Sequence, residues 1–165
     1  MNINGLKLRY INGQCYEFIL PNGKHLITDP YITPENLSGF RRFAVEEIEQ
    51  CDYILLTHTH YDHTSDVGYL CRKFNAKLFA GQMSIMKLAA FYDLDLCLLY
   101  PVEHMEIFEM PDFTLQAIRG KHFGKPGKLS ISHSLNLTQK KFGLEGYGEL
   151  DVLGCVETYD FCLTL

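Results

Sequence analysis

The segment Tyr53–Asp66, with the sequence YILLTHTHYDHTSD, constrains the fold more than any other part of the chain. It begins as an apolar run of strand length and passes directly into His58, His60, Asp62 and His63. An apolar run that does not alternate with polar residues is typical of a strand that is buried on both faces. We therefore expect a buried strand that ends in a histidine-rich loop.

The residues after this loop predict an alternation of helices and strands. Four apolar residues have the i, i+3, i+4, i+7 spacing of one helix face: Val67, Leu70, Cys71 and Phe74. Thr64 or Ser65 is available as the N-cap of this helix. Residues 76–81 then predict a strand, residues 82–94 a second helix and residues 97–102 a third strand. This β-α-β-α-β order predicts a mainly parallel sheet with right-handed crossovers.

Short β-rich segments precede the alternation. Residues 6–11 and 14–20 predict two strands, and Asn22 with Gly23 supplies the positive φ angles of a tight hairpin before residues 25–32. The chain therefore opens as an antiparallel meander, which a polar connector with a short helix over residues 35–50 joins to the buried strand.

Further strands are expected after the alternation, separated by turns that contain Pro, Gly or Asp: residues 106–110, 113–119, 150–158 and 161–165. The class is therefore α/β, with a mixed sheet and additional antiparallel strands.

The composition favours a globular protein that acts on small molecules or proteins. The chain has 165 residues, of which 47% are hydrophobic, and this is enough for a substantial core. Its net charge of -5, without clustered Lys and Arg, disfavours a nucleic-acid enzyme or binding to an anionic membrane. No segment has the features of a signal peptide or a membrane span, so a cytoplasmic protein is expected. Its six cysteines, without a C-x-x-C pair, are interpreted as buried reduced thiols.

The histidine-rich loop predicts a metal site. Protonated imidazoles repel one another, so a cluster of three histidines beside an aspartate is unfavourable unless the side chains share a ligand. If the backbone stays extended past the strand, His58 and His60 point to the same side, and Asp62 and His63 then turn inward as the helix begins. Loops at the carboxyl ends of parallel strands are where α/β sheets build their sites. We therefore expect this cluster to bind a divalent metal.

The same residues carry a family resemblance. His58, His60, Asp62 and His63 match the His-x-His-x-Asp-His signature of the metallo-β-lactamase fold hydrolases. Residues 55–63, LLTHTHYDH, look most like the branch that contains ascorbate-phosphate lactonase-like and phospholipase D-like enzymes. Two weaker motifs lie in the same order as in the family.

The first of these motifs is HLITDPYI, whose Asp29 would order the loop around the site. The second is AIRGKHFG, whose histidine is His122. By resemblance, His58, His60 and His122 would hold one metal, and Asp62 with His63 would begin a second site. The expected cofactor is one or two divalent ions, most simply zinc, although manganese or iron also suits imidazole and carboxylate ligands.

The resemblance implies a hydrolase. Water bound to such a metal loses its proton near neutral pH and can attack an ester, lactone, phosphoester or amide. Asp62 would be the catalytic residue that orients this nucleophile. Three lysines lie near His122 in the sequence: Lys121, Lys125 and Lys128. They either bind an anionic group of a small-molecule substrate, such as phosphate, or belong to a solvated loop without a role in binding.

The resemblance also implies an αββα sandwich, of which residues 1–165 would form a single, incomplete domain with the N-terminal portion. The family's bridging aspartate and last histidine have no counterpart, since residues 153–165 resemble the hairpin that leads up to that aspartate. Asp151, Glu157 and Asp160 are interpreted as turn or surface carboxylates. Two functions therefore stay open. The first is a hydrolase, of which this chain is a fragment or which works with a mononuclear histidine site, and efficient catalysis is expected of its complete form rather than of residues 1–165 alone. The second is a metal-binding or interaction module without turnover.

The remaining histidines carry weaker expectations. His133 would line the pocket or belong to a turn, and His25 and His104 would be solvent-facing or structural. The apolar segment 161–165 would normally pair within a continuing sheet, so an open edge is expected at this segment. This edge predicts a two-fold homodimer with the C-terminal strands in or near the interface.

Overall fold

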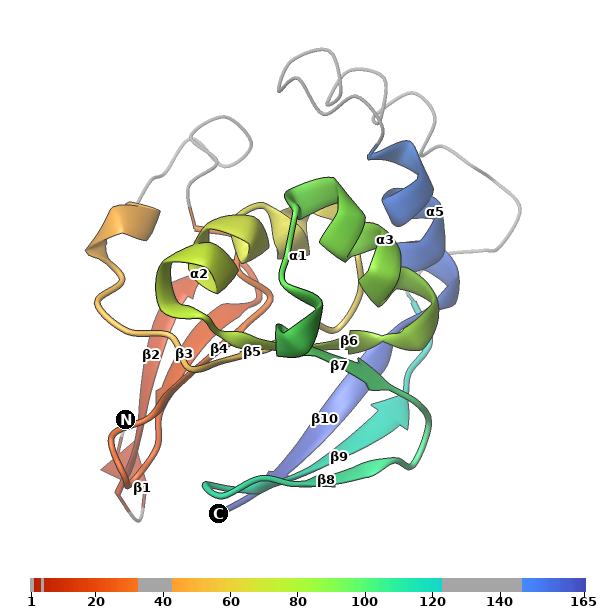
Figure 1. The fold of residues 1–165 in the computed structure, drawn as a ribbon. Helices are drawn as coiled ribbons and strands as arrows, with labels where there is room; N and C mark the ends of the chain where they lie inside the picture. Colours follow the sequence, from red (N-terminus) through yellow and green to blue (C-terminus); the bar gives the residue numbers. More distant parts are fainter. Residues whose placement is uncertain (1, 4, 33–42, 123–146) are drawn as a thin grey trace.

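The computed structural model describes residues 2–3, 5–32, 43–122 and 147–165. Two sheets lie one above the other, and helices cover the free face of the larger sheet (Figure 1). The described layers are therefore helix, sheet and sheet, as expected for the α-β-β part of an αββα sandwich. The last helical layer has no counterpart among the described residues.

The larger sheet has seven strands in sequence order. It opens with antiparallel neighbours and becomes parallel from the fourth strand onward, where Leu26 pairs with Tyr53 and Leu78 with Leu99. The antiparallel opening meander and the parallel βαβ part are thus confirmed. The strands are β1 (Asn2–Ile3), β2 (Leu6–Asn12), β3 (Cys15–Ile19), β4 (His25–Thr28), β5 (Tyr53–Leu55), β6 (Lys77–Gly81) and β7 (Leu99–Val102).

The smaller sheet is antiparallel, with the order β10-β9-β8. Its strands are β8 (Ile107–Glu109), β9 (Thr114–Arg119) and β10 (Tyr159–Thr164). The helices are α1 (Tyr61–Thr64), α2 (Val67–Phe74), α3 (Gln82–Tyr92) and α5 (Gly148–Val156), with short 3-10 helices η1 (Val45–Glu47) and η2 (Leu96–Leu98). None of these described helices has the length and apolar character needed to cross a membrane.

Strand β5 shows why its sequence is apolar without alternation. Ile54 packs in the core between the larger sheet and the helices, together with Leu70 and Leu78. Tyr53 and Leu55 point the other way, into the core between the two sheets. Because both faces of β5 are covered, each residue of this strand is removed from water, and burial of a large apolar side chain contributes about 1.5–3 kcal/mol.

The segment 150–158 differs from the sequence prediction. It was expected to be a strand, but residues 148–156 form helix α5, and only Tyr159–Thr164 is a strand. Leu150 and Gly154, which are one helical turn apart, are both buried. A strand would have placed them on one face together with Val152, which is exposed here.

Three local predictions also need correction. Positive φ occurs at Gly23 but not at Asn22 in the turn between β3 and β4. The residue that precedes α2 is Asp66, rather than Thr64 or Ser65, and it makes no capping hydrogen bond through its side chain. The six cysteines are unpaired, as expected, but two of them, Cys97 and Cys162, are exposed rather than buried.

Candidate metal centre

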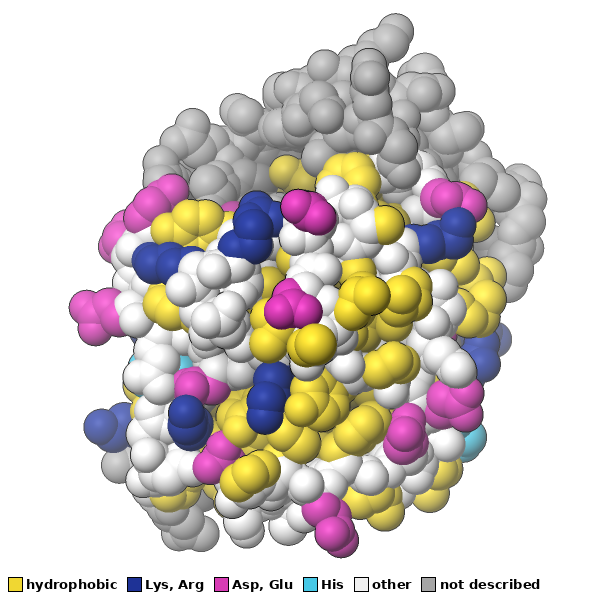
Figure 2. All heavy atoms as spheres, viewed as in Figure 1, with side chains coloured by type: hydrophobic (Ala, Val, Ile, Leu, Met, Phe, Trp, Pro, Cys, Tyr) yellow, Lys and Arg dark blue, Asp and Glu magenta, His cyan; other side chains and the backbone are white. Residues whose placement is uncertain are grey.

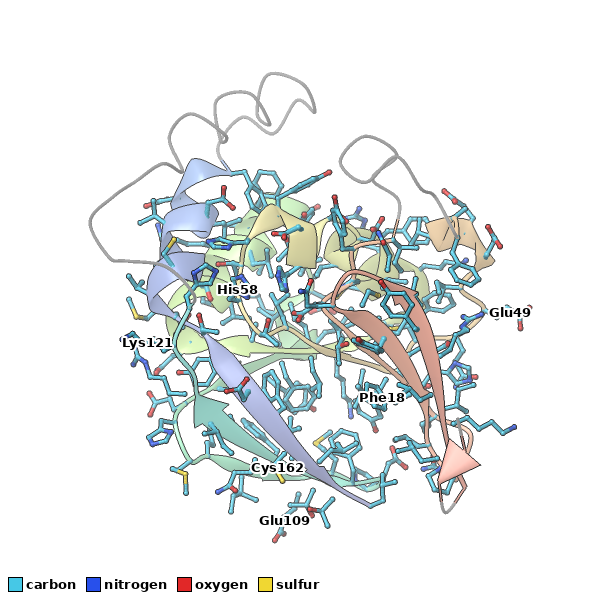
Figure 3. All side chains as sticks on the ribbon, turned by 180° about the vertical axis from the view of Figure 1, so that it is seen from behind. Phe18, Glu49, His58, Glu109, Lys121 and Cys162 are labelled. Carbon is cyan, nitrogen blue, oxygen red and sulfur yellow. The ribbon has the colours of Figure 1, made fainter. Side chains whose placement is uncertain are left out.

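The histidine-rich loop leaves the carboxyl end of β5, as the sequence predicts. Its backbone is held on both sides: Leu56 donates to the Phe79 carbonyl of β6 (2.9 Å), and Tyr159 at the start of β10 donates to the Thr57 carbonyl (2.8 Å). The next turn is α1, which begins at Tyr61 directly after His60. In Figure 3, His58 lies beside α5, at the end of the two sheets.

Three histidines meet at this end of the sheets. One ring nitrogen from each of His58, His60 and His122 lies within 4.8 Å of the other two. Within this triad, His58 Nε2 and His60 Nδ1 are 3.0 Å apart. The His122 ring reaches them from the end of β9, with centroids 4.9 Å from His58 and 4.5 Å from His60.

This donor set fits a divalent metal. Two nitrogen ligands at about 2.0–2.1 Å from a tetrahedral ion are roughly 3.3–3.4 Å apart, close to the separation of His58 and His60 here. Burial, followed by the charges of the neighbouring histidines, lowers the pKa of His58 to about 2. Burial also lowers the pKa of His60, to about 4. Both rings are therefore neutral near pH 7 and carry the lone pair that a metal requires.

His63 lies against this triad. Its ring centroid is 3.9 Å from that of His58, and its Nδ1 is 3.1 Å from Asp29 Oδ2. Burial lowers the pKa of His63, but the hydrogen bond to Asp29 and the charges of Asp29 and Asp62 outweigh it, so the pKa is raised. Asp62 does not turn inward as expected: its side chain is 56% exposed, with one oxygen 3.9 Å from His63 Nε2.

Asp29 orders the loop, as the sequence predicts. This buried residue has a φ of 39° and follows β4. Its carboxylate accepts hydrogen bonds from the Thr57 amide (2.8 Å) and the Thr57 hydroxyl (2.9 Å). The same hydroxyl is 3.0 Å from His58 Nδ1, so Thr57 links the carboxylate to the triad. This contact on the far nitrogen of His58 leaves Nε2, which is 3.0 Å from His60 Nδ1, as the nitrogen that faces the triad.

Helix α5 supplies contacts that the sequence reasoning missed. Cys155 Sγ lies 3.3 Å from His60 Nε2. Asp151 and Glu157 were interpreted as turn or surface carboxylates, but both are buried, whereas Asp160 is exposed as expected. Burial raises the pKa of Asp151 to about 6, although a hydrogen bond from the Tyr61 backbone lowers it.

Other residues named from the sequence lie elsewhere. His25 contacts Glu17 (2.8 Å) and His104 accepts from the Arg119 amide (3.1 Å), so both have the structural role expected for them. Lys121 is exposed at the edge of the molecule (Figure 3). His133, Lys125 and Lys128 lie outside the described residues.

Comparison with known proteins identifies the family of this chain. The family model for the metallo-beta-lactamase superfamily matches residues 12–96, just over half of the chain. The chain belongs to the metallo-β-lactamase superfamily. The resemblance stated from His58, His60, Asp62 and His63 is therefore confirmed at the level of the family, and so is the α/β fold class.

Relatives within the superfamily include proteins named UPF0173 metal-dependent hydrolases. The one from Thermodesulfovibrio yellowstonii is 31% identical over 150 residues, which cover 76% of this chain and 54% of the relative. The one from Staphylococcus carnosus is 41% identical over 71 residues, which cover 43% of this chain and 29% of the relative. The chain thus spans about half, or less, of the length of these relatives.

Solved structures of this superfamily fold are also similar. Igni18, a metallo hydrolase from Ignicoccus hospitalis, has a TM-score of 0.59 at 18% identity, over 73% of this chain and 51% of that chain. A mutant of the β-hydroxylase CmlA has a TM-score of 0.58 at 16% identity, over 79% of this chain and 27% of that chain. The chemotaxis sensor ODP in a peroxy diiron state has a TM-score of 0.50 at 18% identity, over 74% of this chain and 52% of that chain. At these identities the likeness shows a shared fold alone.

Proposed function

We propose that this superfamily member is a metal-dependent hydrolase that acts on an ester, lactone or phosphoester. The observation that carries the proposal is the triad of His58, His60 and His122, whose ligand atoms converge within 4.8 Å. The relatives named as metal-dependent hydrolases support it. When bound, a divalent ion held by neutral imidazoles acts as a Lewis acid and lowers the pKa of its bound water to near 7.

The chain's own residues have distinct roles in this proposal. The triad holds the first ion, and Asp62 with His63 contributes to a second position beside it. Asp29 and Thr57 keep the imidazoles of His63 and His58 in the orientation required. Asp62, which is accessible and next to the cluster, orients the attacking water and is the proposed catalytic residue.

Zinc is the proposed metal, because a closely spaced set of neutral imidazoles suits it. Iron is the alternative that the same ligands allow, and the fold is shared with a diiron protein, the chemotaxis sensor ODP. Element analysis of the protein, purified without added metal, distinguishes the two.

A small molecule is the proposed substrate, and an anionic group such as phosphate is the proposed recognition feature. Lys121 is next to the triad residue His122 in the sequence and exposes a cationic side chain. Lys and Arg do not gather into one patch on the face shown in Figure 2, where acidic and basic side chains are interspersed. Together with the net charge of -5, the absence of a basic patch on this face favours a small ligand over nucleic acid.

The test measures metal content and turnover together. The 165-residue protein is loaded with zinc or iron and assayed with p-nitrophenyl acetate, an aliphatic lactone and bis-p-nitrophenyl phosphate. We expect one to two ions per chain and hydrolysis of at least one substrate. His58→Ala and His122→Ala should remove both properties, whereas His104→Gln, which changes an exposed histidine away from the triad, should leave both intact.

Two results would contradict the proposal. Metal binding that survives in both triad variants would place the ion elsewhere. Stoichiometric metal on the triad with no turnover of any of the three substrates would instead favour the alternative function, a metal-binding or interaction module.

A further inference from the structure

We propose that Cys155 of helix α5 positions the metal ligand His60, by accepting a hydrogen bond from its Nε2–H group and so leaving Nδ1 free for the metal. This inference rests on the proposed metal-dependent function. Cys155 is here a positioning residue: it acts on the site through His60.

The two nitrogens of the His60 ring face different partners. Nδ1 is 3.0 Å from His58 Nε2, on the side of the triad. Nε2 is 3.3 Å from Cys155 Sγ, on the side of α5. A neutral imidazole carries one N–H group, so a proton on Nε2 makes Nδ1 a lone-pair donor, and a proton on Nδ1 would block it. The partner of Nε2 therefore decides whether His60 can bind metal.

Another contact from α5 agrees with this direction. A hydrogen bond to the Asp151 backbone, one turn before Cys155, acts to raise the pKa of His60, although burial lowers it more. A ring that donates to α5 agrees with an N–H group on Nε2, the nitrogen that Cys155 Sγ contacts.

The packing of α5 on the loop is unusually close at this point. A Cβ atom on Gly154 would lie 2.7 Å from Cδ2 of His60 and 3.0 Å from its backbone nitrogen. Two hydrogen bonds hold the helix in place: the Tyr147 hydroxyl donates to the Thr59 carbonyl (3.2 Å), and the Thr59 hydroxyl donates to the Leu150 carbonyl (2.7 Å). The distance from Cys155 to His60 is thus fixed by the docking of the whole helix.

The first experiment measures metal affinity in matched cysteine variants. Zn²⁺ and Co²⁺ dissociation constants are obtained by competition with a chelator for the wild type, Cys155→Ala, Cys155→Ser and Cys97→Ala. Loss of a hydrogen-bond partner behind a ligating histidine typically weakens metal binding by about 10- to 100-fold. We expect a loss of about tenfold or more for Cys155→Ala, and recovery to within about threefold for Cys155→Ser, whose hydroxyl also accepts. Cys97→Ala, which changes an exposed cysteine on η2, should match the wild type.

The second experiment reads the proton on His60 directly. Long-range ¹H–¹⁵N NMR spectra of the zinc-loaded wild type should show His60 with its proton on Nε2, whereas without metal the Nδ1–H group can donate to His58 Nε2 instead. At a zinc concentration near the wild-type dissociation constant, Cys155→Ala should show a larger fraction of His60 with its proton on Nδ1. Thermal unfolding of metal-free Cys155→Ala should stay close to that of the wild type, which separates positioning from a general loss of stability.

The outcomes separate this inference from the proposed function. A wild type that binds no metal would overturn both. A wild type that binds metal while Cys155→Ala binds it equally tightly would overturn the role of Cys155 alone. A sulfur-to-cobalt charge-transfer band would overturn it too, because Cys155 would then be a ligand. If Cys155→Ala fails to fold, a proton on Nδ1 of His60 in the zinc-loaded wild type is the contradicting result.

Discussion

Asp29 and His63 form a hydrogen bond of 3.1 Å between the end of β4 and helix α1, at the edge of the histidine triad. The same carboxylate accepts two hydrogen bonds from Thr57 on the loop after β5. One buried side chain therefore connects two neighbouring parallel strands to the metal-binding loop. Since the φ of Asp29 is positive, an uncommon state that Asp and Asn tolerate best, the residue types available at this position are few.

Replacing Asp29 by Asn should weaken both metal binding and stability. Asn accepts the positive φ, but its neutral amide cannot accept from Thr57 and His63 with the same strength. We expect a loss of about 1–3 kcal/mol in the free energy of unfolding and a measurable rise in the metal dissociation constant. Urea unfolding of the metal-free protein and chelator competition measure these two quantities.

Asp52→Asn is the matched control for Asp29→Asn. The Asp52 carboxylate also links β4 to β5, through hydrogen bonds from the His25 amide (2.9 Å) and the Lys24 ammonium (2.8 Å), but at the opposite end of the strands. This variant should lose stability without a change in metal affinity. Equal metal affinities for the two variants would show that Asp29 has no role at the site.

Replacing Asp62 by Asn should lose far more turnover than metal. The triad does not include Asp62, and its side chain is 56% exposed, so the first ion should stay bound. A carboxylate that orients water or moves a proton is typically worth about 10²- to 10⁴-fold in rate. We expect a fall in kcat within this range, with metal at the triad retained, measured on the substrate that the wild type hydrolyses best.

Asp160→Asn is the control for this prediction, since it neutralises an exposed carboxylate on β10 and should leave kcat unchanged. Near wild-type turnover in Asp62→Asn would refute the catalytic role of Asp62. A loss of metal from the triad equal to the loss of rate would make it a ligand of the first ion instead.

Local patterns in the sequence identify most of the fold and the loop that carries the site. Each of these patterns reflects which residues of one short segment are buried, and so it can be read without knowing the rest of the chain. They are the apolar run of β5, the helical spacing of Val67 to Phe74 and the alternation of strands and helices. The motif His58 to His63 is likewise local. His122 was found only because its segment resembles a family motif, since nothing in its own neighbourhood distinguishes it from a solvated histidine.

The sequence prediction was wrong where distant segments decide the environment. Helical spacing is present at Leu150, Leu153 and Gly154, whereas the β-branched residues Val152 and Val156 favour a strand. The segment forms a helix because α5 docks on the loop near Thr59 and His60. Cys155 and Asp151 gain their roles from that same docking. A single sequence does not show which segments meet, so their burial could not be read from their neighbours.

Self-association remains a proposal, and strand β10 gives it a specific test. Among the described strands, β10 pairs with β9 alone, and beyond Tyr159, whose amide donates to Thr57, its other edge has no strand partner in the described part of the chain. Cys162 is exposed on this strand. We expect a dimer in sedimentation velocity at micromolar concentration, under reducing conditions, and a monomer for Cys162→Lys, because lysine on an edge strand opposes pairing. Cys97→Lys should remain dimeric. A monomeric wild type would disprove the dimer.

Glu157, at the C-terminal end of helix α5, caps the N-terminus of helix α3, and its negative charge should contribute to the free energy of unfolding. Its buried carboxylate accepts hydrogen bonds from the Met83 amide (3.0 Å), the Ser84 amide (3.0 Å) and the Ser84 hydroxyl (2.6 Å). Anions at a helix N-terminus are favoured by the helix dipole, and a glutamine would place an NH₂ group against donors. Glu157→Gln should therefore lower the free energy of unfolding by about 1–3 kcal/mol in urea titrations.

The comparison for Glu157→Gln is Glu149→Gln, the same chemical change at the other end of α5. Glu149 is 71% exposed and pairs with Lys87 (2.6 Å) on the surface. Exposed ion pairs contribute about 0–1 kcal/mol and weaken with salt. The loss for Glu149→Gln should therefore fall in that range and disappear at high ionic strength, whereas the loss for Glu157→Gln should persist because its partners are buried. Equal, salt-sensitive losses for both variants would mean that the Glu157 carboxylate is solvated in solution and does not cap α3.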